Sequence, residues 1–513
     1  YYTALSSLRR NHRDHLELAE AYWELKRYQE ASASLAQALD IAPHSPLANM
    51  MWGLDFPVIP TNRAQIEEAR SRYQAQLHKL KTLLDADTNN PEWILAFSRS
   101  CFFLNYHGGD DFILLQQHQA LQTQYLQANT HTQKIITKTN NKKIRLGVFS
   151  ANLHGHTVFR YFSRWLLELD RQQFEVVILH AGKWQDAHTD TLIHSGVDYH
   201  YIFHQANLND YIAQLGLDIL LTLDVGMAGR NMPLLSYRMA PVQCVTWGHP
   251  VTTAASEVDY YLSSEAQEPE DAQAHYRETL IRLPGLGICF TPIEAPAPAE
   301  VSKYGLDPQR PVCLIAQSLF KLMPECDALF AEICRRVPTV QLVLFAKADD
   351  VDRQLLHARM RKAFDAIGVP IDAHVHYLPT VSHAEFCALF KASTLSLDSL
   401  FFSGGNTSLD GLANDCPIVT LPGRYMRGRQ TYGMYQVMGF TELIAKDEAD
   451  YVGLACRLLQ EADFRQHCVD EIAQRKNKLF HNVQAVRHFE QALIDMHSGN
   501  SSNKKLNAKS PRG

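Results

Sequence analysis

The first quarter of the chain carries a helical pattern of hydrophobic positions. Up to about residue 138, apolar residues recur three and four positions apart, and no alternation typical of a strand appears. One stretch fits the 34-residue spacing of a tetratricopeptide repeat, through Leu18, Ala19, Tyr22, Tyr28, Ala31, Leu35, Ala38, Leu39 and Pro43. A single helix pair of this kind does not bury its faces alone. We therefore expect either further repeats before Tyr1 or a cap formed by the helices between Gln65 and Leu126.

Beyond this region, short β-rich runs alternate with helical stretches, a pattern that builds parallel sheets covered by helices on both faces. A Pro- and Ala-rich break at 291–298 separates two such series. The first series predicts strands at 144–150, 174–180, 218–223 and 242–247. The second predicts strands at 312–317, 340–346, 375–378, 395–398 and 418–421.

The pattern predicts four parts. A helical, tetratricopeptide-like region covers 1–138, and two Rossmann-like domains cover 139–297 and 298–497. Two such domains in sequence imply a ligand cleft between them. The tail at 498–513 is rich in Ser, Asn and Lys and poor in hydrophobic residues, so we expect it to be disordered.

Composition and charge exclude several classes of protein. The 513 residues carry 49 Lys and Arg against 55 Asp and Glu, a formal net charge of −6, without long runs of either sign. Nucleic-acid binding is not expected, because it requires gathered positive charge. Ten cysteines lie mostly in apolar runs without a CxxC pair, which indicates buried thiols in a reducing cytoplasm. No run of about 18 apolar residues occurs, so we expect no membrane contact.

The strongest chemical motif is the segment SGGNTSLD at 403–410, which follows a predicted strand and opens a helix. Its two glycines allow close backbone approach, and the free N–H groups of the first helical turn favour an anion such as a diphosphate. Thr407 and Asp410 share one helical face. Thr407 can donate to a phosphate while Asp410 accepts from ribose hydroxyls. An ordinary glycine turn, with Asn406 or Thr407 as helix N-cap, explains the same residues.

Two further candidates follow the first strand of each series. Lys321 stands at a strand's carboxyl end, where it can neutralise a leaving phosphate, although most lysines are simply solvated. His156, in the motif His154-Gly155-His156, can reach the cleft as acid, base or hydrogen-bond donor. Because no Cys or His partner stands at ligand spacing, we predict no metal site. The basic loop PGRYMRGR at 422–429 either contacts phosphate or is a solvated turn.

Taken in order, these motifs resemble glycosyltransferase family 41, which holds the O-GlcNAc transferases and the SPINDLY-type proteins. The resemblance includes APVQ, WGHPVT and VDY between 240 and 260, and IVTLPG at 418–423. It implies an α/β chain with a GT-B fold, in which two Rossmann-like domains follow a tetratricopeptide-type region. It also implies inverting sugar transfer from a UDP-sugar without a bound metal or other cofactor.

The resemblance assigns roles to single residues. Lys321 is similar to the family's diphosphate-binding lysine, and His156 to a histidine that faces the sugar and the acceptor. The other donor-binding residues it implies are Gln317, Val381, Gly404, Gly405, Asn406, Thr407, Asp410 and Arg427, with His249 and Pro250 on the acceptor or sugar side. The chain departs from the family pattern where Val225-Gly226-Met227 replaces a common GHT, which leaves the sugar and the acceptor open.

We therefore expect a cytoplasmic, metal-independent glycosyltransferase that moves N-acetylglucosamine from UDP-GlcNAc to Ser or Thr hydroxyls of an acceptor protein or peptide. Its partners are the nucleotide sugar and the acceptor, with no nucleic acid and no membrane, and the sequence does not indicate an oligomeric state. One alternative is a protein O-fucosyl- or N-glucosyltransferase that uses another nucleotide sugar. Another is a repeat-bearing scaffold without turnover, which the segment 225–227 favours.

Overall fold

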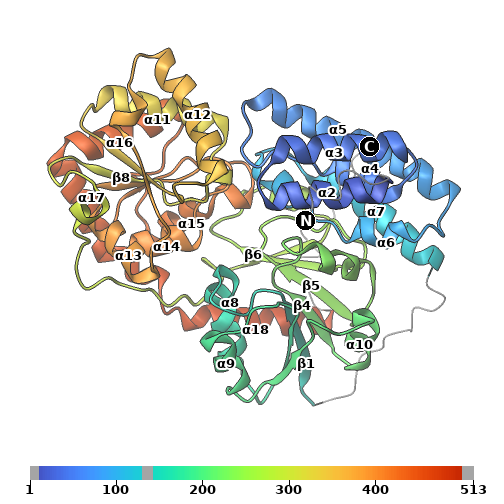
Figure 1. Cartoon of the computed structure of the whole chain (residues 1–513). Helices are drawn as coiled ribbons and strands as arrows, with labels where there is room; N and C mark the ends of the chain where they lie inside the picture. The colour runs from blue at the N-terminus through green and yellow to red at the C-terminus, as the bar shows by residue number, and fades with distance from the viewer. Residues whose placement is uncertain (1–10, 130–141, 500–513) are drawn as a thin grey trace.

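The computed structural model describes residues 11–129 and 142–499, which form three parts. We call residues 11–129 the helical region, 142–290 the first lobe and 298–482 the second lobe. Figure 1 shows the helical region in blue above the green first lobe, with the yellow and orange second lobe beside both. The chain has the α/β fold class expected from the sequence, with helices followed by two parallel sheets.

The helical region is a succession of packed helices. α2 and α3 form an antiparallel pair, as the repeat spacing predicts, and Ala19 and Ala38 are buried between them. α4 packs on α3 and α5 packs on α4, so the first pair is covered on one side. The elements are α2 (His12–Glu24), α3 (Tyr28–Ile41), α4 (Pro46–Gly53), α5 (Arg63–Ala86), α6 (Glu92–Phe97), the 3-10 helix η1 (Phe102–Tyr106) and α7 (Phe112–Asn129).

The first lobe contains a seven-stranded parallel sheet with the order β3-β2-β1-β4-β5-β6-β7. Its strands are β1 (Ile144–Ser150), β2 (Phe174–His180), β3 (Asp198–Tyr201), β4 (Ile219–Thr222), β5 (Val242–Thr246), β6 (Tyr260–Ser264) and β7 (Thr279–Leu283). The sequence prediction missed β3, β6 and β7. The helices are α8 (Thr157–Glu168), α9 (Ala187–Ile193), α10 (Leu208–Gln214), η2 (Gly229–Ser236) and η3 (Ala272–His275).

The second lobe contains a five-stranded parallel sheet with the order β10-β9-β8-β11-β12. Its strands are β8 (Val312–Leu314), β9 (Gln341–Phe345), β10 (Val375–Leu378), β11 (Leu395–Leu397) and β12 (Ile418–Val419). All five lie within the predicted strands. The helices are η4 (Val301–Tyr304), η5 (Leu319–Lys321), α11 (Pro324–Arg336), α12 (Val351–Ala366), η6 (Ile371–Ala373), α13 (His383–Ala392), α14 (Asn406–Ala413), η7 (Met426–Gly428), α15 (Gln430–Met438), α16 (Glu448–Gln460), α17 (Ala462–Arg475) and η8 (Lys476–Leu479).

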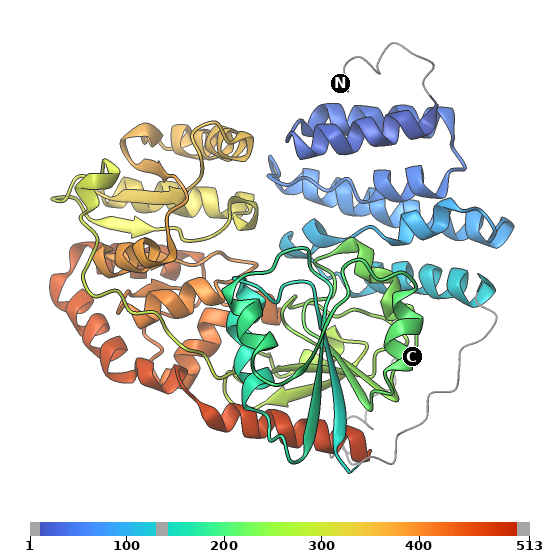
Figure 2. The same ribbon diagram turned by 60° about the horizontal axis from the view of Figure 1, so that its bottom comes forward.

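The last helix, α18 (Val483–Ser498), corrects the predicted domain division. We expected residues up to 497 to belong to the second domain, but α18 packs on α8 and β7 of the first lobe. The ring of Phe489 stacks on Trp165 at a centroid distance of 4.0 Å. Figure 2 shows this red helix along the underside of the first lobe. From residue 500 on, the predicted disordered tail lies outside the described residues.

Two further expectations concern cysteines and membranes. All ten cysteines are buried and unpaired, as their apolar surroundings predict. Across residues 11–129 and 142–499, no helix has the length and apolar character that a membrane span requires.

Candidate active site

Ligands of doubly wound sheets bind beyond the carboxyl ends of the strands at which the strand order reverses. In the second sheet these strands are β8 and β11, which pair with each other. Gln317 and Lys321 follow β8, and Gly404 and Gly405 follow β11. The fold therefore brings these two predicted segments to the same edge of one sheet.

A chain of hydrogen bonds joins Lys321 to the start of α14. Lys321 Nζ donates to Gln317 Oε1 at 3.2 Å, and Gln317 Nε2 donates to Thr407 Oγ1 at 3.0 Å. Gln317 is buried, whereas Lys321 and Thr407 are partly exposed. An ammonium group, an amide and a hydroxyl thus line one short path at the carboxyl edge of the sheet.

α14 begins in a way that suits an anion. Its N-cap residue is Gly405, and within residues 11–129 and 142–499 no side chain caps its first N–H groups. The alternative in which Asn406 or Thr407 is the N-cap is therefore wrong. The buried Oδ1 atom of Asn406 has no hydrogen-bond partner among the described residues. Because uncapped helix N–H groups and buried amides both require partners, this end of α14 is prepared for a polar ligand.

Asp398, directly after β11, holds the glycine loop in place. Its carboxylate accepts hydrogen bonds from Ser403 Oγ at 2.6 Å, from the backbone N–H of Gly404 at 2.7 Å and from Thr420 Oγ1 at 2.8 Å. Burial raises the pKa of Asp398, and these hydrogen bonds oppose the rise. The loop is fixed by a buried polar network rather than by contact with solvent.

Side chains would not fit at the two glycines of this loop. A Cβ atom at Gly404 would lie 2.6 Å from Gln317 Nε2, and one at Gly405 would lie 2.1 Å from the hydroxyl of Tyr161 in α8. The Tyr161 hydroxyl also donates to Gln430 Oε1 at 3.1 Å. Gly404 is therefore needed because Gln317 of the same lobe lies close to it, and Gly405 because α8 of the first lobe approaches the loop closely.

Lys321 has an unusual electrostatic environment for a lysine. Burial lowers the pKa of its ammonium group to about 8, and the negative charge of Asp398 partly opposes this change. Its Nζ atom lies 4.8 Å from the centre of the Phe402 ring. A partly desolvated ammonium gains strongly when a polyanion binds beside it.

Asp410 lies on α14 as expected, but its carboxylate already binds two cationic side chains. Arg160 of α8 donates to Oδ1 at 2.8 Å and to Oδ2 at 3.0 Å, and His383 Nε2 lies 2.9 Å from Oδ2. Burial opposes ionisation of Asp410, but the hydrogen bonds from His383 and Arg160 outweigh it and lower its pKa. The hydrogen bond to Asp410 raises the pKa of His383 to about 9. Asp410 thus joins the lobes, and any ribose hydroxyl would share its oxygens with Arg160.

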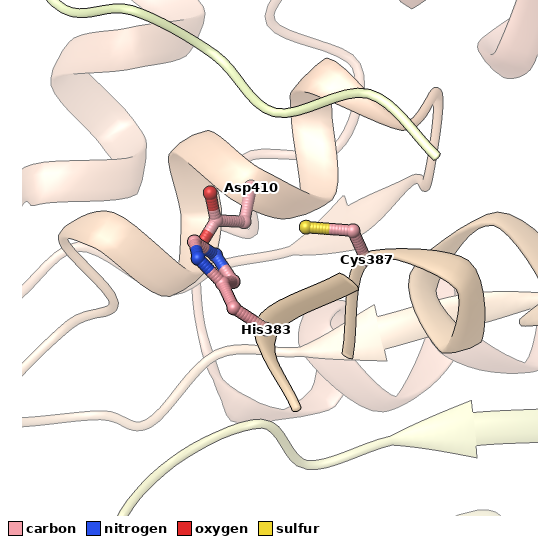
Figure 3. A group of neighbouring side chains, drawn as sticks. All are labelled: His383, Cys387 and Asp410. Carbon is pink, nitrogen blue, oxygen red and sulfur yellow. The ribbon is translucent and has the colours of Figure 1, made fainter. Parts of the chain in front are cut away.

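Figure 3 shows the side chains of His383 and Cys387, on α13, directed toward Asp410 on α14. One ligand atom from each lies within 4.8 Å of the others, a set that chemically suits a transition metal. However, the guanidinium of Arg160 donates to both oxygens of Asp410. A metal ion would have to displace this fixed cation, so we interpret the group as an ion-pair cluster.

His156 caps α8 at the facing edge of the first sheet. Its Nδ1 accepts the backbone N–H of Val158 at 3.2 Å. Burial, together with the nearby His154, lowers the pKa of His156 to about 4, so the ring is neutral near pH 7. Because Nδ1 accepts a hydrogen bond, the neutral ring carries its proton on Nε2. This geometry makes His156 a hydrogen-bond donor rather than a base.

The loop that carries His156 is anchored by a carboxylate that sequence reasoning did not identify. Asp224, beyond β4, accepts hydrogen bonds from Ser150 Oγ and from Asn152 Nδ2, both at 2.7 Å. β1 and β4 flank the reversal of strand order in the first sheet. The His156 loop therefore occupies, in the first lobe, the position that ligand-binding loops take in such sheets.

Val381 lies in the loop after β10, directly before Ser382, the N-cap residue of α13. Its half-buried side chain packs in a cluster with Phe386. The backbone at Val381 therefore stands two residues from His383, at the same carboxyl edge as Lys321. Its predicted contact with the nucleotide stays a prediction.

Arg427 departs from its predicted role. Its side chain is buried, and Nη2 donates to the carbonyl of Gly109 at 2.6 Å and to Asp111 Oδ2 at 3.0 Å. Both partners belong to the helical region. The guanidinium of Arg427 therefore binds groups at the junction with the helical region and not a phosphate. The reason is that a buried arginine is stable only beside a buried carboxylate.

His249 and Pro250 also lie at a junction rather than in an open cleft. His249 Nε2 is 2.6 Å from Asn105 Nδ2, and its ring stacks on Phe102 at 5.9 Å. Burial lowers the pKa of His249 to about 4. Pro250 is buried and lines a small cavity beside Arg427. We therefore correct the prediction that these residues face the sugar or the acceptor.

Several residues of this edge were missed by the sequence analysis, namely Arg160, Tyr161, His383 and Gln430. Arg160 is four positions after His156, so the helical period placed it near the cleft. Ser382 and Glu385 form a capping box, which marks the start of a helix at His383. These signals indicate where Arg160 and His383 lie on their helices. They do not indicate Asp410 as the partner of both, because tertiary packing brings it there.

The chain is similar to several known proteins. Residues 298–489 match the family model described as "Glycosyl transferase family 41". The "Probable UDP-N-acetylglucosamine--peptide N-acetylglucosaminyltransferase SPINDLY" of Petunia hybrida is 25% identical over 338 residues, covering 63% of this chain and 35% of that protein. The Arabidopsis thaliana protein of the same name is 26% identical over 338 residues, covering 63% and 36%. The chain thus spans about a third of the length of these curated relatives.

Among solved structures, a mutant of the Thermobaculum terrenum O-GlcNAc transferase aligns with 96% of this chain and 91% of its own, at a TM-score of 0.74 and 21% identity. This likeness confirms the fold class predicted from the sequence, in which helices precede two Rossmann-like lobes. At this level of identity it speaks for the fold alone.

Proposed function

We propose that the chain, whose residues 298–489 match the model of glycosyltransferase family 41, transfers N-acetylglucosamine from UDP-GlcNAc to Ser or Thr hydroxyls of polypeptides. The observation that carries this proposal is the path from Lys321 through Gln317 to Thr407, at the uncapped start of α14. This site offers a cation, a hydroxyl and free N–H groups to a diphosphate. The names of the SPINDLY relatives support the choice of donor and acceptor.

The proposed reaction inverts the anomeric carbon. The acceptor oxygen forms a new bond to that carbon as the bond to the β-phosphate oxygen of UDP breaks, and the hydroxyl proton passes to solvent or to the phosphate. Negative charge therefore develops on the departing diphosphate. Lys321 and the start of α14 are the preorganised groups that stabilise this charge.

We assign His156 a positioning role in this reaction. Its Nδ1 is engaged with Val158, and its low pKa keeps the ring neutral. The Nε2–H group can hold the acceptor oxygen or a sugar hydroxyl, which orients the nucleophile without accepting its proton.

We further propose that the reaction needs no metal ion, since Lys321 and the helix start supply positive charge where a metal would otherwise act. Activity should then survive prolonged treatment with EDTA. Loss of activity on chelation, with recovery on adding one divalent metal, would overturn this part of the proposal and redirect attention to His383, Cys387 and Asp410.

The proposed function is tested by incubating the protein with UDP-GlcNAc and a peptide library, followed by mass spectrometry. The expected result is a gain of one N-acetylhexosamine on Ser or Thr. Thermal shifts with UDP, GDP and their sugar conjugates identify the donor, because a ligand at 100 times its Kd stabilises by about 2.7 kcal/mol. A shift with GDP-fucose, or sugar on Asn, would favour the other transferase activities. UDP binding without transfer or hydrolysis would favour a scaffold.

A further inference from the structure

η1 of the helical region carries three aromatic side chains that enter the junction between the two lobes. We call Phe102, Phe103 and Tyr106 the aromatic wedge. On the side of the first lobe, Phe102 stacks on His249 at 5.9 Å. Tyr106 is buried with 5% of its surface exposed, so the wedge is a packed contact and not a surface patch.

On the side of the second lobe, the wedge contacts two aromatic rings that are sequence neighbours of the donor site. Tyr106 stacks on Phe402 at a centroid distance of 4.4 Å and an interplanar angle of 27°, and meets Phe320 edge-on at 4.9 Å. Phe103 also meets Phe320 edge-on, at 5.8 Å. Phe320 directly precedes Lys321, and Phe402 directly precedes the glycine loop at 403–405.

The ammonium group of Lys321 lies over one of these two rings. Its Nζ atom lies 4.8 Å from the centre of the Phe402 ring, within the range of a cation–π interaction. Phe402 is therefore shared between Tyr106 of the helical region and Lys321 of the second lobe. A shift of the Phe402 ring therefore changes the contact that positions the ammonium group of Lys321.

The chain after the wedge is built for close approach to the second lobe. Gly108 has φ +78°, and a Cβ atom there would lie 2.6 Å from the Phe401 ring. Glycine tolerates this left-handed conformation without strain and removes the steric conflict. The helical region can therefore press directly against Phe401 and Phe402.

We propose that the aromatic wedge is a positioning element of the donor site. Tyr106 fixes Phe402 and Phe320, and these rings set the place of the Lys321 ammonium relative to the glycine loop. The helical region thus contributes to the geometry of the diphosphate subsite. This inference rests on the proposed function, because it assumes that Lys321 meets the diphosphate of the donor.

The test is a double-mutant cycle with UDP and uridine as probes, because only UDP carries the diphosphate. Calorimetry gives the Kd of each probe for the wild type, Tyr106→Ala, Lys321→Met and the double variant. Tyr106→Ala should weaken UDP about tenfold and uridine by less than about twofold. In the Lys321→Met background the same change should alter UDP affinity by less than about twofold, because the group it positions is gone.

Two further variants keep the test decisive. Tyr106→Phe retains the ring and should bind UDP as the wild type does, and Tyr106→Leu replaces the alanine variant if that variant does not fold. The matched control is Lys26→Met, which removes bonds to Asp350 at 2.7 Å and Asp352 at 2.6 Å elsewhere between the helical region and the second lobe. It should leave UDP affinity unchanged.

Equal weakening of UDP and uridine in Tyr106→Ala, or full additivity with Lys321→Met, would overturn the inference and leave the wedge a structural contact only. A wild type that binds UDP no more tightly than uridine would instead contradict the proposed function. The two failures are therefore distinguishable in one set of titrations.

Discussion

Two helices meet where the two lobes contact each other, and they begin in opposite ways. α8 starts with a side-chain cap, since Nδ1 of His156 accepts the N–H of Val158. α14 starts at Gly405 without any side-chain cap and with Lys321 connected to its first turn through Gln317. A capped helix has little left to offer an anion, whereas an uncapped one retains free N–H groups. In the proposed reaction, charge stabilisation therefore falls to the second lobe and orientation to the first.

The largest effect is expected at the uncapped helix. Lys321→Met should lower kcat by about 10²–10³, because a preorganised charge beside the leaving group is lost. Circular dichroism and the Tm should stay close to the wild type, since burial already disfavours this cation. Lys303→Met, at a lysine with 72% of its side chain exposed, is the control and should leave kcat unchanged. Wild-type kcat in Lys321→Met would contradict the division of roles.

The next effect concerns the ion pair that ties the two helices together. Arg160→Gln removes the guanidinium from the buried carboxylate of Asp410 and leaves His383 beside it, which should lower the free energy of unfolding by about 2 kcal/mol. Urea denaturation measures this change. The control, Arg335→Gln, breaks an exposed pair with Glu332 and should cost less than about 0.5 kcal/mol. Equal stability of the two variants would mean that Arg160 does not join the lobes.

A smaller effect separates the two roles of His156. Asparagine is a good N-cap residue, so His156→Asn should keep the Tm while lowering kcat by about tenfold through loss of the Nε2–H donor. His156→Ala should lower kcat similarly and also cost about 1 kcal/mol of stability. Differential scanning calorimetry and steady-state kinetics measure the two quantities. If His156→Asn retains full activity, the ring has no role beyond the cap.

The smallest effect is a dependence of UDP binding on pH. Burial lowers the pKa of Lys321 to about 8, so its ammonium is lost as pH rises through that value instead of near its usual range. UDP remains fully ionised above about pH 7. UDP affinity should therefore decline above about pH 8 in the wild type and stay level in Lys321→Met. Titrations at a series of pH values provide the measurement, and parallel curves for the two proteins would argue against the lysine.

The sequence predicted the elements that depend on local pattern. β1, β2 and β10 begin and end at the residues that the sequence pattern predicts. β3, by contrast, reads DYHY and has no buried residue, so its hydrophobic signal is absent. α18 has a helical pattern, but nothing local indicates that Phe489 packs on Trp165 in the other lobe.

The same limit applies to the site. Gln317, Lys321 and Thr407, which the structure brings together, were singled out because strand ends and glycine loops have recognisable signals in the sequence. Arg427 was misplaced because its partner Asp111 lies 316 residues away in the chain. Asp410 was assigned to ribose alone because its partner Arg160 comes from the opposite lobe. The ion-pair partners of these charged residues are set by tertiary packing. The residues next to them in the sequence do not indicate those partners.

The most direct measurement is a structure of the protein bound to UDP. We expect the diphosphate to lie within hydrogen-bond distance of Lys321 Nζ and of the backbone N–H groups of Asn406 and Thr407, with α14 unchanged. A diphosphate bound away from the start of α14, with Lys321 still donating only to Gln317, would contradict this expectation.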